Sequence, residues 1–187
     1  MTRSETVADA AISLLAERGM RGLTHRAVDE AAGLPSGSTS NLARTRAALL
    51  ALALSRLTEL ELRALAPALR EDSAESSDLS DLPGRMAEAI HIQLSDRRRT
   101  LARYELALEA TRRPELREIY DRAGRNFRDP AVALLTALGS ADPVRHARQL
   151  VAFGEGLMFD AVAGAGATPT LAELNDAMRD LLAGMLR

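Results

Sequence analysis

Apolar residues recur at every third or fourth position along most of the chain. This spacing places them on one face of an α-helix. They are chiefly Leu and Ala, which favour helices, whereas aromatic residues, which favour strands, make up 3% of the sequence. The clearest stripe comprises Leu171, Leu174, Ala177, Met178, Leu181, Leu182 and Met185. We therefore expect an all-α fold.

Glycines, prolines and capping residues divide this pattern into about nine helices. Asp142-Pro143 and Thr168-Pro169 each place a capping side chain before a proline, which is typical of a helix start. Residues 71–83 are acidic and rich in Ser and indicate a loop, and residues 125–130 predict an interruption or kink of a long helix. The expected helices are 3–18, 24–32, 35–41, 45–69, 84–94, 97–111, 114–138, 143–163 and 169–186.

The length of 187 residues fits one large domain or a small domain joined to a larger one. Three short helices precede a long helix in the expected order, and the remaining helices follow it. We therefore expect a small N-terminal unit, residues 1–47, fused to a helical bundle, residues 48–187.

Composition argues against several classes of protein. The chain has no Cys and only 3 His, which are scattered, so we expect no disulfide, no metal and no cofactor. It has no apolar stretch long enough for a membrane helix, and its N-terminus lacks the pattern of a signal peptide, so we expect a cytoplasmic protein. Because the formal net charge is −2, any nucleic-acid binding must come from a local basic patch.

Residues 24–44 predict two helices joined by a sharp turn, the pattern of a helix-turn-helix. Gly33 can take the positive φ that such a turn needs. The second helix, expected to begin at Pro35, is rich in Ser, Thr and Asn, which compete with helix formation and are tolerable where the outer face binds a ligand. An ordinary pair of helices fits the same pattern. The basic residues around the motif favour DNA binding: Arg21, His25, Arg26, Arg44 and Arg46.

Over about residues 5–50 the chain resembles the N-terminal DNA-binding domain of the TetR family of transcriptional regulators. The matching residues are Glu17-Arg18-Gly19, Thr24, Ala32-Gly33-Leu34, Gly37-Ser38, Thr45-Arg46 and Leu49-Leu50. Two departures stand out. Residues 40–43 are Ser-Asn-Leu-Ala where the family often has aromatic residues, and Asp29 stands where many helix-turn-helix proteins keep Ala.

The resemblance implies specific contacts with a DNA duplex. Thr24 and Arg46 would contact phosphate, with Arg44 as a further candidate. Asn41 could read adenine through two hydrogen bonds, and three serines would also face base edges. For the serines the alternative is a solvated helix surface, and for the arginines a surface ion pair. The candidate interface is Thr24, His25, Arg26, Ser36, Gly37, Ser38, Ser40, Asn41, Arg44 and Arg46.

The aromatic residues all lie between residues 104 and 159. They either fill a core or, as the resemblance implies, partly line a cavity for a small molecule. Glu105 and Glu109 form a like-charge pair, which either is neutralised by Arg112 and Arg113 or includes a carboxylate for a cationic ligand. The candidate pocket is Met86, Ile90, Tyr104, Glu105, Leu108, Tyr120, Phe127, Phe153 and Met158.

We expect a repressor that forms a homodimer through the helices at 143–163 and 169–186. Gly154 and Gly156 in the first of these indicate a close helix–helix approach or a kink. Two recognition helices about 34–36 Å apart would bind a near-palindromic operator. An unknown small-molecule effector would release the DNA by favouring a different distance between the two recognition helices. The alternatives are a helical enzyme and an interaction module without DNA binding, and the lack of Cys, paired His and a Gly-rich phosphate loop argues against the enzyme.

Overall fold

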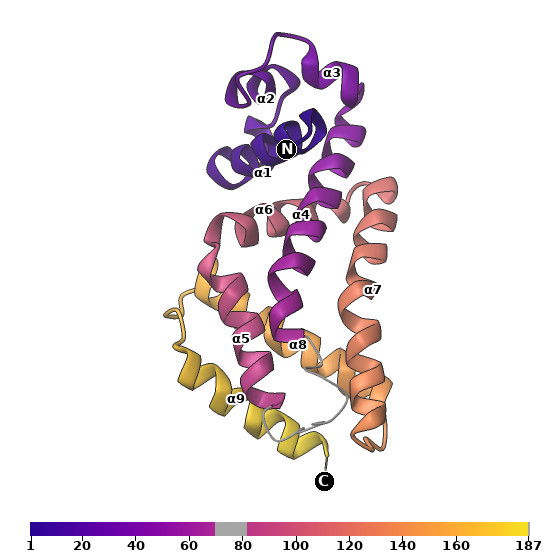
Figure 1. Cartoon of the computed structure of the whole chain (residues 1–187), viewed down its shortest axis with the longest axis vertical. Helices are drawn as coiled ribbons and strands as arrows, with labels where there is room; N and C mark the ends of the chain where they lie inside the picture. The colour runs from indigo at the N-terminus through magenta and orange to yellow at the C-terminus, as the bar shows by residue number, and fades with distance from the viewer. Residues whose placement is uncertain (70–81, 187) are drawn as a thin grey trace. The chain divides into compact units, whose positions relative to one another are not determined.

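The structure, a computed structural model, describes residues 1–69 and 82–186, except for the side chains of residues 67–69. Within these ranges the chain forms nine helices and no strand, which confirms the expected all-α fold (Figure 1). None of the described helices is long and apolar enough to cross a bilayer. The helices are α1 (Arg3–Gly22), α2 (His25–Ala31), α3 (Ser38–Leu42), α4 (Arg46–Leu69), α5 (Leu82–Ser95), α6 (Arg97–Ala110), α7 (Pro114–Ala137), α8 (Pro143–Val162) and α9 (Leu171–Met185).

The chain packs as two compact units. The first comprises Met1–Glu61 and Arg97–Ala123, and the second comprises the described residues of Leu62–Asp96 and Gly124–Arg187. This packing places α6 and the start of α7 with the N-terminal helices, so it does not follow the functional boundary expected after residue 47. That boundary stays a prediction.

The first unit is built on a core of aliphatic side chains from α1, α2, α4, α6 and α7. α6 lies along α1, and α2 packs on both α1 and α3 (Figure 1). Fully buried leucines provide most of the core volume, and burial of this kind of side chain is the main favourable term in folding. They are Leu15, Leu23, Leu49, Leu50, Leu57, Leu106 and Leu116.

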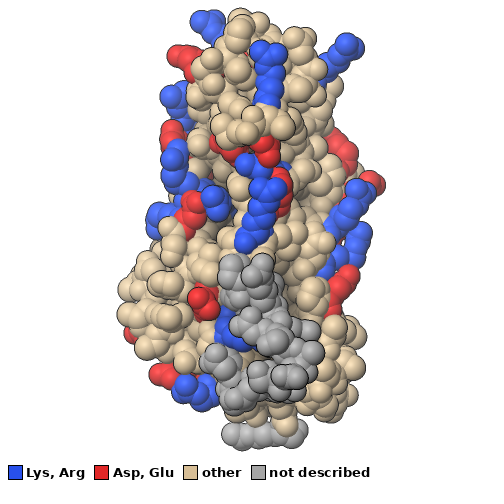
Figure 2. Space-filling view, viewed as in Figure 1, with Lys and Arg blue, Asp and Glu red and all other residues tan. Residues whose placement is uncertain are grey.

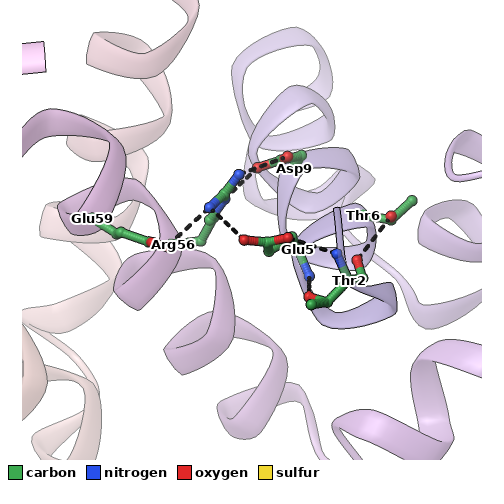
Figure 3. A network of polar contacts seen from close by, with 6 residues as sticks. All are labelled: Thr2, Glu5, Thr6, Asp9, Arg56 and Glu59. Atoms are coloured by element: carbon green, nitrogen blue, oxygen red, sulfur yellow. Dashed lines mark hydrogen bonds and ion pairs between the residues drawn. The ribbon is translucent and has the colours of Figure 1, made fainter. Parts of the chain in front are cut away.

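A charged network joins α1 to α4 beside this core (Figure 3). The guanidinium of Arg56 lies 2.9 Å from Asp9, 3.3 Å from Glu5 and 2.9 Å from Glu59. Hydrogen bonds from Arg56 to Asp9 and Glu59 raise the pKa of the guanidinium, which therefore stays charged. Glu5 also accepts the backbone N–H of Thr2, the residue that caps α1. The network therefore links the first two turns of α1 to the middle of α4.

The second unit contains α5, α8 and α9. α5 packs against both α9 and α8. A Cβ placed on Gly154 of α8 would lie 3.5 Å from the Cδ1 atom of Ile90, an ordinary van der Waals distance, so the packing of α8 on α5 does not itself require a glycine there. Gly156 has open space around its Cβ position and is exposed. The apolar stripe predicted for the last helix is buried in this unit at Leu174, Met178, Leu182 and Met185, whereas Leu171, its first member, is 45% exposed.

Three predicted helix starts can be compared with the structure. Asp142 caps α8 as expected, because its side chain accepts the backbone N–H of Arg145. The start predicted at Thr168-Pro169 is wrong by two residues, since Thr170 caps α9 and Glu173 completes a capping box. The start predicted at Pro35 is also wrong. α3 begins at Ser38, because Gly37 takes a left-handed φ of 88° immediately before it.

Helix ends and breaks also differ in places. α1 continues past Gly19 to Gly22, although Gly19 kinks it with a φ of 62° and a ψ of −170°. Pro130 lies inside α7, which runs through it as one helix, so an interruption there is wrong, while a kink stays a prediction. The predicted loop over residues 71–83 lies outside the described residues except at its last two positions, which belong to α5.

Candidate nucleic-acid interface

α2 and α3 form a compact helix-turn-helix. The Thr24 hydroxyl caps α2 by accepting the backbone N–H of Ala27 at 3.1 Å. Gly33 has a φ of 64° and Gly37 a φ of 88°, so both ends of the turn use the left-handed region that glycine adopts without strain. The turn is closed by the N–H of Leu34, which donates to the carbonyl of Asp29. The two helices are thereby brought to the short spacing that the motif requires.

The carboxylate of Asp29 receives three hydrogen bonds from the start of α3. It accepts the backbone N–H of Gly37 at 2.7 Å, the backbone N–H of Thr39 at 2.7 Å and the Thr39 hydroxyl at 2.6 Å. Asp29 is 4% exposed and Thr39 is fully buried. The Thr39 hydroxyl, followed by the two N–H groups, holds the pKa of Asp29 below its ordinary value although burial acts in the opposite direction. The buried carboxylate is therefore ionised at neutral pH.

His25 holds the other end of α3. Its Nε2 atom lies 2.6 Å from the carbonyl oxygen of Ala43, the residue that follows α3. Because a carbonyl can only accept, Nε2 must carry the hydrogen in this contact. His25, predicted as a DNA contact, therefore has an internal partner.

The outward face of the motif consists of short polar side chains and one leucine. Ser36, Ser40, Asn41 and Leu42 are exposed, and Leu42 is 45% exposed. Ser38 is instead buried, on the side of α3 that carries Thr39. The structure thus brings three of the four predicted base-reading side chains to one surface and leaves Ser38 out.

Basic side chains border this face. Arg26 and Arg44 are exposed, and Figure 2 shows several basic side chains over the part of the first unit that carries α2 and α3. Arg46 differs, because its guanidinium donates to the backbone carbonyls of Leu23 and Met20, each at 2.5 Å. Arg46 therefore fastens the start of α4 to the end of α1 and to Leu23, which follows α1. A phosphate contact by this side chain stays a prediction.

Met20 is held from a second side by α6. Its backbone N–H donates to Glu105 Oε2 at 3.0 Å, while its carbonyl accepts from Arg46. Glu105, predicted to line a ligand pocket, is thus engaged with the kinked end of α1. Glu109 pairs with Arg113 at 2.5 Å and Arg112 at 3.8 Å, so for this carboxylate the neutralised alternative is the one found.

The candidate pocket residues divide between the two units. Tyr104, Glu105, Leu108 and Tyr120 belong to the first unit, where Tyr120 packs against the core and Leu108 is 60% exposed. The second unit holds the remaining candidates, of which Ile90 and Met158 are buried. They are Met86, Ile90, Phe127, Phe153 and Met158.

The sequence predicts that Leu34 or Thr39 seats the second helix on the first, and Thr39 is fully buried. Sequence reasoning missed the hydrogen bonds that Asp29 and His25 make within the motif. The signal available was the acid at a position where other helix-turn-helix proteins keep Ala. A buried acid requires donors, and Thr39, ten residues further on, is one of them.

This arrangement of a glycine turn, a short second helix with exposed polar groups and neighbouring arginines defines a helix-turn-helix DNA-binding protein. The sequence model of the tetracyclin repressor-like C-terminal domain matches residues 77–187, more than half of the chain. The chain belongs to the TetR family of transcriptional regulators, which confirms the resemblance of its N-terminal motif.

Solved structures agree with this assignment over nearly the whole chain. A transcriptional regulator from Rhodococcus sp. Rha1 is 25% identical with a TM-score of 0.82, and the match covers 99% of this chain and 96% of that one. A TetR family member from Streptomyces coelicolor A3 is 28% identical with a TM-score of 0.78, covering 97% and 98%. The multidrug binding protein EbrR, complexed with malachite green, is 30% identical with a TM-score of 0.71, covering 100% and 99%. No curated protein sequence matches the chain.

Proposed function

We propose that the chain is a dimeric repressor that binds a near-palindromic operator through α3 and releases it when a small organic molecule binds the second unit. The observation that carries the proposal is the exposed polar face of α3, which Asp29 and His25 of α2 hold in a fixed position. Residues 1–47 would be the DNA-binding part of the first unit. Such a role requires a cytoplasmic location.

On DNA, the roles follow from exposure and chemistry. Asn41 offers a donor and an acceptor to an adenine edge, and Ser36 and Ser40 offer hydroxyl groups. The Thr24 hydroxyl accepts an N–H within its own helix, which leaves its hydrogen to donate to phosphate. Arg44 supplies a phosphate cation from the segment that follows α3. Ser38 has no part in this set because it is buried.

Duplex binding tests the DNA proposal. We expect fluorescence anisotropy with an operator selected from random duplexes to show affinity that falls steeply with added salt. Arg44→Ala should weaken binding to all duplexes and reduce the salt slope by about 1, whereas Asn41→Ala should cost about 1–3 kcal/mol at one base position. Arg122→Ala, an exposed arginine on α7, is the matched control. The proposal fails if the wild-type chain shows no preference among duplexes.

For the dimer, the outer face of α8 is the proposed contact. Phe159 is 52% exposed and Val144 is 58% exposed, so α8 offers two large apolar side chains for burial against a second chain. Ala152 and Gly156 are exposed on the same helix and would allow a second helix to approach closely. Phe159→Arg should therefore yield monomers in analytical ultracentrifugation, while Arg122→Ala, an exposed change on α7, should not.

For the effector, EbrR offers a chemical guide, because it has been solved with bound ligands. EbrR has been solved with imidazole and with three aromatic cations: proflavin, ethidium and malachite green. We propose the same class for this chain, bound among the second-unit candidates around Ile90, Phe153 and Met158. Proflavin should then show raised fluorescence polarisation with the wild-type chain. Phe153→Ala should weaken proflavin binding, whereas Leu108→Ala, in the first unit, should not. Equal effects of the two substitutions would contradict a ligand site in the second unit.

We propose that α6 transmits ligand binding to the DNA-binding part, residues 1–47. α6 lies within the residues matched by the C-terminal family model, and it holds the end of α1 through Glu105 and Met20. Arg103 of α6 also pairs with Glu61 of α4 at 3.3 Å, with both side chains buried. A ligand that shifts α6 would therefore strain its contacts with α1 and with α4. Glu105→Ala should leave dye binding unchanged and reduce the loss of DNA affinity that the dye causes.

A further inference from the structure

The helix α3 is too short to hold its own conformation. It has five residues, and isolated helices shorter than about 12–15 residues are marginal in water. Its sequence of Ser, Thr, Ser, Asn and Leu contains one strong helix former, and its N-cap is Gly37, which has no side chain to cap it. Its position must therefore be fixed from outside.

That support comes from one face of α2. His25 and Asp29 are four residues apart and therefore lie on the same side of the helix. Asp29 takes the donors at the first turn of α3, and His25 donates to the carbonyl of Ala43 at the far end. The two side chains thus hold α3 at both ends.

Hydrogen bonds of this kind control rotation as well as distance. An apolar pair at positions 29 and 39 would hold α3 by contacts without direction, because hydrophobic burial is not directional. The carboxylate instead needs both the N–H and the hydroxyl of Thr39, at 2.7 and 2.6 Å, and they meet it only when Thr39 faces inward. Ser40 and Asn41 then face outward.

We propose that Asp29 and His25 are positioning residues for DNA reading: they set the rotation of α3 about its axis and so decide which of its side chains face the bases. Thr39 is the partner through which Asp29 acts. This inference rests on the proposed DNA binding of the chain. It assigns specificity to two residues that need not contact DNA.

The test uses the full chain and two readouts. Amide hydrogen exchange at Gly37 and Thr39 reports the Asp29 contacts without DNA. Duplex titrations report the ratio of specific to non-specific affinity. Thr39→Val removes the hydroxyl and keeps the shape of the side chain, and Thr39→Ser restores the hydroxyl, so the pair forms a matched comparison.

We expect Asp29→Ala to speed exchange at both amides by at least about tenfold, while α9 amides are unchanged. Thr39→Val should lower the affinity for the selected operator about tenfold, while its affinity for non-specific duplexes stays within about twofold of the wild-type value. Thr39→Ser should bring the operator affinity back to within about threefold of the wild-type value. His25→Ala should lower specific affinity in the same way.

Each contrary outcome has a distinct meaning. Unchanged exchange in Asp29→Ala overturns the contact itself. Faster exchange with an unchanged specificity ratio overturns the role in DNA reading. If Asp29→Ala does not fold, the Thr39→Val and Thr39→Ser pair decides, and equal specificity in the two overturns the proposal. A wild-type chain that prefers no duplex would refute the proposed function, while exchange would still report on the contact.

Discussion

The second helix of the helix-turn-helix, α3, and the C-terminal helix, α9, are held in opposite ways. α9 has 15 residues, a capping box formed by Thr170 and Glu173, and a buried stripe that includes Leu174 and Met178. α3 has five residues and no side-chain cap, and polar groups of α2 hold it. The residues that determine the structure of α9 therefore lie mostly in its own sequence, whereas α3 depends on side chains of α2.

The difference suits the two roles proposed for these helices. A helix that enters the major groove must keep its polar atoms for the bases, so it has little apolar surface with which to anchor itself. A helix that packs in a core can use the whole of one face for burial. Changes in α9 should therefore lower the stability of the fold. Changes around α3 should instead alter which side chains of α3 face the DNA.

The largest expected effect is in the core stripe of α9. Leu174→Ala should lower the free energy of unfolding by about 2–5 kcal/mol, because Leu174 is 1% exposed and its loss leaves a cavity. Urea denaturation at fixed protein concentration measures it. Leu186→Ala, at a residue 39% exposed just beyond α9, is the control and should cost much less. Equal losses of unfolding free energy in Leu174→Ala and Leu186→Ala would contradict the claim that the buried stripe holds α9.

The next effect concerns the charged network between α1 and α4 in the unit that carries α3. Arg56→Ala should cost about 1–3 kcal/mol, because it leaves Glu5, Asp9 and Glu59 close together without their cation, while the partial exposure of these acids limits the loss. Arg3→Ala changes an exposed arginine of the same unit and should have little effect. The loss should shrink in high salt. A loss that is independent of salt would point to packing of the Arg56 alkyl chain instead.

A smaller effect is expected at the start of α9. Thr170→Ala removes the capping hydroxyl and should cost about 1 kcal/mol, whereas Thr170→Ser should restore most of it. Thermal unfolding of the three chains measures this difference. No change in Thr170→Ala would mean that the stripe alone defines α9.

The smallest effect is a pH dependence at Asp29. Its pKa is lowered in the folded chain, chiefly by the Thr39 hydroxyl, so the ionised form stabilises the fold above the ordinary value of 3.8, and this contribution is lost as the pH falls through the lowered pKa. The difference in unfolding free energy between wild type and Asp29→Asn should therefore be constant from pH 5 to 8 and narrow below about pH 4. A difference that persists unchanged in acid would contradict an ionised carboxylate at this site.

The same contrast explains how far the sequence could predict the structure. The stripe of α9 and the cap of α8 at Asp142 were predictable because propensity, period and capping all act within a few residues. The start of α3 was not, because Pro35 gives a local helix signal that the glycine turn and the Asp29 carboxylate override. The internal bonds of Arg46 and Glu105 also depend on partners far away in the chain, the carbonyl and the N–H of Met20. No local pattern could reveal them.

Methylation footprinting of guanine N7, combined with 7-deazaadenine substitution in a selected operator, tests the central claim most directly. The account predicts two protected major-groove patches on one face of the duplex, about one helical turn apart, and one adenine in each patch whose 7-deaza substitution weakens binding of the wild type but not of Asn41→Ala. No protection at guanine N7, or the same response of the two chains to substitution at every adenine, would contradict it.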